Sequence, residues 1–158
     1  MTRGRSITMM GLCVLAMTAV PVAGAEPPPG VDVIDTYPVA QGHYSTDLHD
    51  YGWIFFKTPD GRACGMAPNG GSVGCDAVPA DAPQGTTETV FSSWAPASYH
   101  HSDTATFTRD VDVLPEGQRL EIQGSSCALG SQDTGYPGSV ICKHGHGFVL
   151  ANTHGILW

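Results

Sequence analysis

Histidine is the residue type in this sequence that points most directly to chemistry. The chain of 158 residues has seven histidines, and its 15 Asp and Glu outnumber its 7 Lys and Arg. Imidazole nitrogen is a preferred ligand of Zn²⁺ and Cu²⁺, and His144 and His146 would face the same way on a strand. These two are our candidate metal ligands. We favour the alternative that Gly145-His146-Gly147 is a tight turn whose histidine bonds the backbone.

Carboxylates and nucleophiles give weaker signals. Asp110 and Asp112 would lie on one strand face, roughly 6–7 Å apart, a separation that fits glycoside hydrolysis or a cation site. A solvated polar face explains this pair without chemistry, and we favour that explanation. The sequence has no G-x-S-x-G, S-x-x-K or H-E-x-x-H motif and no phosphate-binding glycine loop. We therefore expect no catalytic residue and no cofactor.

Aromatic side chains in predicted loops are the remaining candidates. Tyr99 falls in such a loop and Trp94 borders it; binding residues concentrate in loops, and these two side chains suit a carbohydrate or peptide ligand. The formal net charge of −8 leaves no basic surface for nucleic acid or for an anionic membrane. We expect neither partner.

The N-terminus predicts export. Met1–Ser6 is basic, Thr8–Val20 is apolar, and Ala23 and Ala25 form an A-x-A pair, the order found in secretory signal peptides. The apolar run has about thirteen residues, against the ~20 of a membrane-spanning helix. We predict a signal peptide over residues 1–25. The product would be extracellular or in the cell envelope, with no membrane span.

The cysteines agree with export. Cys13 lies in the leader, and the other four (Cys64, Cys75, Cys127 and Cys142) are an even number, as expected in an oxidising compartment. Four cysteines permit three sets of pairs. We favour 64–75 and 127–142, because each of these pairs brackets a predicted hairpin.

The second cysteine of each pair ends the same pattern, G-S-V-x-C, at 71–75 and 138–142. Two hairpins of similar build are compatible with an old internal duplication. A metal site made by these cysteines is disfavoured, because no two of them have C-x₂₋₄-C spacing.

The elements that must position these residues are short strands. The segment 51–57 (YGWIFFK) is the strongest, and its two apolar faces predict a strand in the middle of a sheet. We predict a loop at 95–103. Further strands are predicted at 31–34, 62–67, 73–76, 89–94, 104–113, 118–123, 125–129, 139–144 and 148–152. Evenly spaced strands without a helical period predict an all-β fold, a disulfide-stabilised antiparallel sandwich or a partly open barrel. This domain would span 51–158, after an N-terminal arm or linker at 26–50.

Several short motifs follow one another between Trp53 and Trp158. They are F-x-T-P-D-G-x-x-C at 56–64, V-x-C-D at 73–76, L-P-x-G at 114–117, V-x-C at 140–142 and G-H-G-F at 145–148. This set resembles a group of small exported actinobacterial proteins of unknown function, common in mycobacteria. The resemblance implies secretion and paired cysteines. It implies no chemistry, because that group has no established activity.

Taken together, these patterns predict a secreted, non-catalytic module of the extracellular space or cell envelope with an unidentified ligand. The first alternative is a divalent-metal-binding secreted protein that uses His144 and His146. The second is a cell-envelope enzyme.

Overall fold

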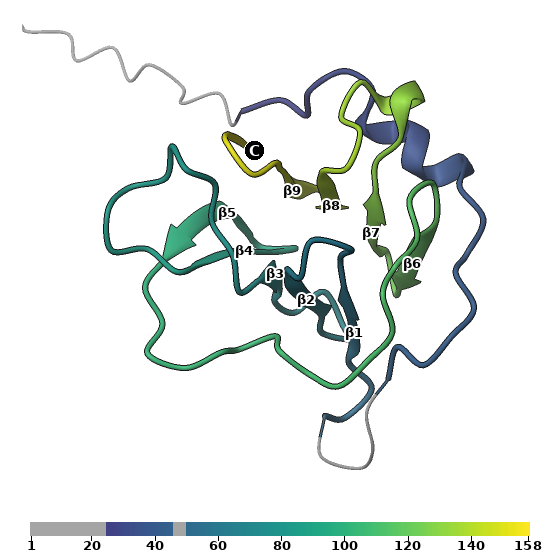
Figure 1. The fold of residues 1–158 in the computed structure, drawn as a ribbon, viewed down its shortest axis with the longest axis horizontal. Helices are drawn as coiled ribbons and strands as arrows, with labels where there is room; N and C mark the ends of the chain where they lie inside the picture. Colours follow the sequence, from purple (N-terminus) through teal and green to yellow (C-terminus); the bar gives the residue numbers. More distant parts are fainter. Residues whose placement is uncertain (1–24, 46–49) are drawn as a thin grey trace, which may run out of the picture.

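The computed structural model describes residues 25–45 and 50–158, which form an all-β fold with little helix (Figure 1). Two antiparallel five-stranded sheets each keep their strands in chain order. Sheet 1 contains β1 (Ile54–Lys57), β2 (Ala63–Met66), β3 (Val73–Cys75), β4 (Glu88–Ser92) and β5 (Ala95–His100). Sheet 2 contains β6 (Arg119–Ile122), β7 (Ser125–Leu129), β8 (Val140–His144), β9 (His146–Leu150) and β10 (Gly155–Leu157). The predicted fold class is confirmed as a sandwich whose sheets do not close into a barrel.

The two sheets share one buried core. Phe56 and Phe91 of sheet 1 belong to the same apolar cluster as Leu129 and Phe148 of sheet 2. The rings of Phe91 and Phe148 meet edge to face with centroids 5.7 Å apart, an arrangement that aromatic quadrupoles favour. The four disulfide cysteines are fully buried in this cluster as well.

The two disulfides occupy equivalent places in the two sheets. Cys64 and Cys75 are direct partners across β2 and β3, and Cys127 and Cys142 are direct partners across β7 and β8. Their Cα atoms are 3.9 and 4.1 Å apart. Both predicted pairings are the ones found. In each sheet the disulfide joins the second strand to the third, so the two sheets are built on one plan.

The outer face of sheet 2 is partly covered by the N-terminal arm. A 3₁₀-helix, η1 (Val31–Thr36), lies beside β7 (Figure 1). Its Val31 and Ile34 are buried against Ile141 and Val149. The strand predicted at 31–34 is therefore wrong, because apolar residues three apart share one face of a 3₁₀-helix. The arm packs against the β-domain as part of its structure.

The outer face of sheet 1 is covered by the segment 104–113, and the strand predicted there is wrong. Phe107 is buried over two glycines, and a Cβ atom at Gly74 or Gly65 would lie 2.8 or 3.1 Å from its ring. The Asp76 carboxylate accepts hydrogen bonds from the backbone N–H of Phe107 and of the residue before it, both at 2.8 Å. Because a side chain binds these donors, the alternating pattern produces a covering loop without a strand ladder.

Asp76 and Lys143 are equivalent anchors in the two sheets, since each follows the second cysteine of its disulfide. Asp76 holds the cover of sheet 1. Lys143 holds η1, because its Nζ donates to Asp32 Oδ1 at 2.6 Å and to Asp35 Oδ2 at 2.7 Å. The two halves therefore share a layout but carry opposite charges at the anchor.

The strand predicted at 51–57 forms in its second half, as β1, and lies at an edge of sheet 1 instead of in its middle. Its two apolar faces are explained by two cores, since Phe56 enters the shared core and Phe55 stacks on Trp53 with centroids 5.5 Å apart. The exposed edge is partly covered, because the backbone N–H of Phe55 donates to Tyr44 O at 2.7 Å.

Sequence reasoning missed two strands. The predicted loop 95–103 contains β5, and no strand was predicted at β10. Both are only partly buried, and β5 has the sequence A-P-A-S-Y-H, in which the apolar residues are two small alanines and a tyrosine and one position is a proline. Pairing with β4 and β9, and not intrinsic preference, forms these strands.

The predicted signal peptide, residues 1–25, lies outside the described residues except for Ala25. Within 25–45 and 50–158, no helix is long and apolar enough to cross a membrane.

The shared plan predicts that the two disulfides contribute similarly to stability. They close loops with sequence separations of 11 and 15 residues, for which the chain-entropy model gives about 3 kcal/mol each and a difference of about 0.3 kcal/mol. We expect the double variants C64S/C75S and C127S/C142S to lose similar free energies of unfolding in urea titrations. A loss more than about 2 kcal/mol larger for one pair would contradict the equivalence. Non-reducing peptide mass spectrometry checks the pairing itself.

Candidate functional site

The connections of the two sheets gather at opposite ends of the sandwich. The β2–β3, β4–β5, β6–β7 and β8–β9 turns form one end, which we call the tip end. There the backbone N–H of Asn69 donates to the Gln123 side chain of sheet 2, and the Ser93 N–H donates to Gly70 O at 3.0 Å. The β1–β2, β7–β8 and β9–β10 connections form the loop end.

The candidate metal ligands lie at the tip end. His144 and His146 are direct partners across the β8–β9 turn, which is made by Gly145 with φ +74°. Within this pair, His144 contacts a polar side chain, because its Nδ1 lies 2.9 Å from Ser125 Oγ. Among residues 25–45 and 50–158, no group of three or more His, Cys, Asp or Glu is placed to hold a metal ion. His49 lies outside these ranges.

The Ser125–His144 contact resembles the nucleophile and base of a hydrolase. Ser125 is only 1% exposed, however, and the two side chains of this contact belong to neighbouring strands of sheet 2. No carboxylate of the described residues bonds His144 to complete a triad. The contact fits a structural hydrogen bond between β7 and β8.

The predicted ligand-binding aromatics do not form one site. Trp94 is 72% exposed in the β4–β5 turn at the tip end. Tyr99 lies near the other end of β5, and its hydroxyl occupies the space that a side chain at Gly155 would need. Burial raises the pKa of Tyr99, and the nearby Asp81 carboxylate adds to this shift. Tyr99 therefore packs between β5 and β10, whereas Trp94 projects into solvent.

The candidate acid pair is also separated. Asp110 Oδ1 lies 3.5 Å from Lys57 Nζ, whereas Asp112 Oδ2 accepts a 2.7 Å hydrogen bond from the His43 backbone. The two carboxylates thus contact different parts of the chain, Lys57 of β1 and the backbone of His43. This placement gives no support to a paired-carboxylate mechanism.

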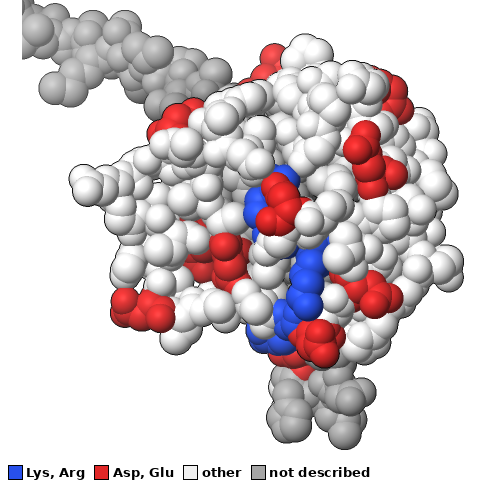
Figure 2. Space-filling view, viewed as in Figure 1, with Lys and Arg blue, Asp and Glu red and all other residues white. Residues whose placement is uncertain are grey.

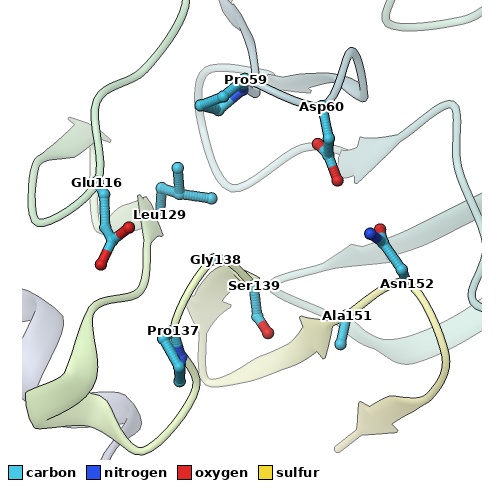
Figure 3. A pocket seen from close by; sticks show the side chains of 9 residues that line it. All are labelled: Pro59, Asp60, Glu116, Leu129, Pro137, Gly138, Ser139, Ala151 and Asn152. Atoms are coloured by element: carbon cyan, nitrogen blue, oxygen red, sulfur yellow. The ribbon is translucent and has the colours of Figure 1, made fainter.

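A pocket of about 340 Å³ opens at the loop end (Figure 3). Figure 3 shows the Asp60 and Asn152 side chains pointing toward each other, with Glu116 on the opposite wall. Asp60 bonds Arg62 Nε at 3.0 Å. The Arg62 guanidinium in turn donates to the backbone oxygens of Leu150 and Gly138 in sheet 2 at 2.5 and 2.8 Å.

Asp60 therefore helps to hold Arg62 in place, and Arg62 joins the two sheets. We call this pair of residues and its bonds to the backbone of sheet 2 the clamp. Burial alone would raise its pKa, but hydrogen bonds from Thr58 and Arg62 outweigh this effect and hold the pKa below 3.8. Asp60 is therefore ionised at neutral pH and already bonded, which suits a structural role better than acid catalysis.

A second concave region lies on the outer face of sheet 2, between η1 and the β6–β7 hairpin. It consists of two adjoining hollows of about 390 and 460 Å³, which share Asp35, Gly124 and Ser126. We call it the sheet-2 groove. It is open to solvent along that part of the sheet that η1 leaves uncovered.

The floor of the groove contains a buried hydroxyl without a partner. Glu121, Ser126 and Lys143 are successive cross-strand partners on β6, β7 and β8, so they share one face. Ser126 is only 7% exposed, and its Oγ is the one buried side-chain polar atom in the described ranges that makes no hydrogen bond. An unsatisfied buried hydroxyl costs about 1–3 kcal/mol. Such a cost calls for an explanation.

The charges of the groove are paired with one another. Lys143 bonds Asp32 and Asp35, and these two bonds outweigh desolvation and raise its pKa. Arg119 bonds the Glu121 carboxylate and also donates to the backbone oxygen of Tyr37 at 2.8 Å. The basic groups of the groove are therefore already neutralised.

The wider surface agrees with the acidic composition. On the face in Figure 2, Lys and Arg form a narrow band with Asp and Glu on both sides. That face has no broad basic patch of the kind that binds polyanions.

No protein family, no curated protein and no solved structure matches this chain.

Sequence reasoning missed the groove, although part of it was readable. Cys127 and Cys142 face the core, so their neighbours Ser126 and Lys143 must point outward. The alternation thus places a serine and a lysine side by side on the outer face. The contribution of η1 could not be predicted from the sequence, because Asp32 bonds Lys143, which lies 111 positions away in the chain.

The clamp at the loop end predicts a pH-dependent stability. Because the folded pKa of Asp60 is lowered, its stabilising effect is present above its ordinary pKa of about 4 and is lost as pH falls through the folded value. We expect Asp60→Asn to lower the free energy of unfolding at pH 7 by less than about 1 kcal/mol, since the side chain is 38% exposed. The difference from wild type should shrink as the pH falls through the lowered pKa of Asp60.

Urea titrations at pH 7, 4 and 2 measure this effect. The matched control is Asp110→Asn, which removes an exposed ion pair to Lys57 and should change nothing measurable. A pH-independent effect of Asp60→Asn would contradict the clamp.

Proposed function

We propose that this protein is a secreted, non-catalytic module of the extracellular space or cell envelope that binds its ligand in the sheet-2 groove. The observation that carries the proposal is the Ser126 hydroxyl, buried without a partner in the floor of an open groove. A buried polar group without a partner requires an explanation, and functional sites are where proteins most often break such local rules. The two buried disulfides support an oxidising compartment.

The resemblance to exported actinobacterial proteins supports the same location. It rests on the ordered motifs between Trp53 and Trp158, beginning at Phe56 and closing at Phe148. The metal-binding alternative is less well supported, since His144 already bonds Ser125.

Substitutions of two adjacent serines in β7 test whether the unpaired hydroxyl in the groove lowers the free energy of unfolding. Ser126→Ala removes an unsatisfied hydroxyl, so we expect the free energy of unfolding to rise by about 1 kcal/mol. Ser125→Ala is the matched control, and it should lower that free energy by about 1 kcal/mol because it removes the bond to His144. Urea titrations measure both changes. Destabilisation by Ser126→Ala would mean that its hydroxyl has a structural partner, and the argument for a ligand would fail.

A serine-directed fluorophosphonate probe tests the enzyme alternative. We expect no adduct, because no carboxylate of the described residues bonds His144 to complete a triad. Intact-mass spectrometry after incubation provides the measurement. An adduct on wild type that is absent from Ser125→Ala would support a hydrolase and contradict the non-catalytic proposal.

A further inference from the structure

The ligand class can be inferred from the way in which the groove balances its own charges. We propose that the sheet-2 groove binds an uncharged, hydroxyl-rich ligand, that is, a neutral glycan. This inference rests on the proposed function, because it concerns the same site.

Electrostatics disfavours a charged ligand. An anion would meet three carboxylates, those of Asp32, Asp35 and Glu121, and both basic groups are already engaged. A cation that took over the two η1 carboxylates would leave Lys143, whose side chain is 18% exposed, without its counter-charges. A mostly buried charge without a partner is costly.

A neutral ligand with hydroxyl groups matches the hydrogen-bonding capacity that remains. Each ionised carboxylate has about four lone-pair sites and the lysine ammonium has three donors, of which two are used. The Ser126 hydroxyl both donates and accepts. Sugar hydroxyls also do both, so one ring can bond carboxylate and ammonium while supplying the missing partner of Ser126.

The residues that line the groove argue against a peptide ligand. Peptide recognition on a sheet uses pockets for alternate side chains, but the groove lining is mainly polar or charged. Its one large aromatic, Trp158, is 4% exposed because its indole packs on Gly147. Hydrogen bonding to polar and charged side chains is the chemistry that this groove offers.

The test is an NMR titration of the disulfide-bonded, ¹⁵N-labelled protein (26–158) with trimers that differ in charge. Tri-N-acetylchitotriose and cellotriose are neutral, the glucosamine trimer is the cationic match of the first, and trigalacturonate is an anionic trimer. Trialanine represents a peptide. We expect the neutral trimers alone to shift the amides of 124–126 and 143–145.

Two variants locate the binding. Ser126→Ala should weaken binding of the neutral trimers roughly three- to tenfold, and because it is expected to be at least as stable as wild type, misfolding cannot explain the loss. Trp94→Ala at the tip end is the control and should leave binding unchanged.

The outcomes separate the two proposals. Stronger binding of the glucosamine trimer, trigalacturonate or trialanine at the same amides, with loss in Ser126→Ala, would overturn the glycan inference and leave the groove as the site. If the neutral trimers lose binding only in Trp94→Ala, or if no probe shifts the groove amides, both the inference and the proposed groove are overturned.

Discussion

The two buried disulfides determine which face of each sheet points inward. Each one joins direct cross-strand partners, and all four sulfurs lie in the single core between the sheets. A register slip of one residue would turn every side chain of a strand to the opposite face. By fixing the β2–β3 and β7–β8 registers, the disulfides therefore fix what each outer face presents to the rest of the chain.

What the outer faces present differs between the two sheets. Beside the disulfide of sheet 1, Gly65 and Gly74 leave a flat surface that Phe107 fills. Beside the disulfide of sheet 2, Ser126 and Lys143 leave a polar surface that η1 covers only in part. Because the cover of sheet 1 is complete at this position and that of sheet 2 is not, the candidate site lies on sheet 2.

Local patterns in the sequence predicted most of the fold. The cysteine pairs and the strands of the hairpins were predictable, because turn residues and apolar residues lie close together in the chain. The prediction of a strand at 104–113 was wrong because the side chain of Asp76, which is distant in the sequence, accepts hydrogen bonds from backbone N–H groups of this segment. The groove was not predicted for a similar reason, since two of its three acids come from η1 and its lysine from β8, far apart in the sequence.

The opposite charges of Asp76 and Lys143 have a consequence for folding. Two halves with the same layout are at risk of exchanging their covering segments, because the apolar contacts that attract each cover are not specific. The acidic helix η1 would meet the Asp76 carboxylate if it docked on sheet 1, and like charges repel. On sheet 2 the same helix meets an ammonium group and binds it through two short hydrogen bonds. The opposite charges of these two anchor residues thus favour docking of each covering segment on its own sheet and disfavour an exchange of the two segments.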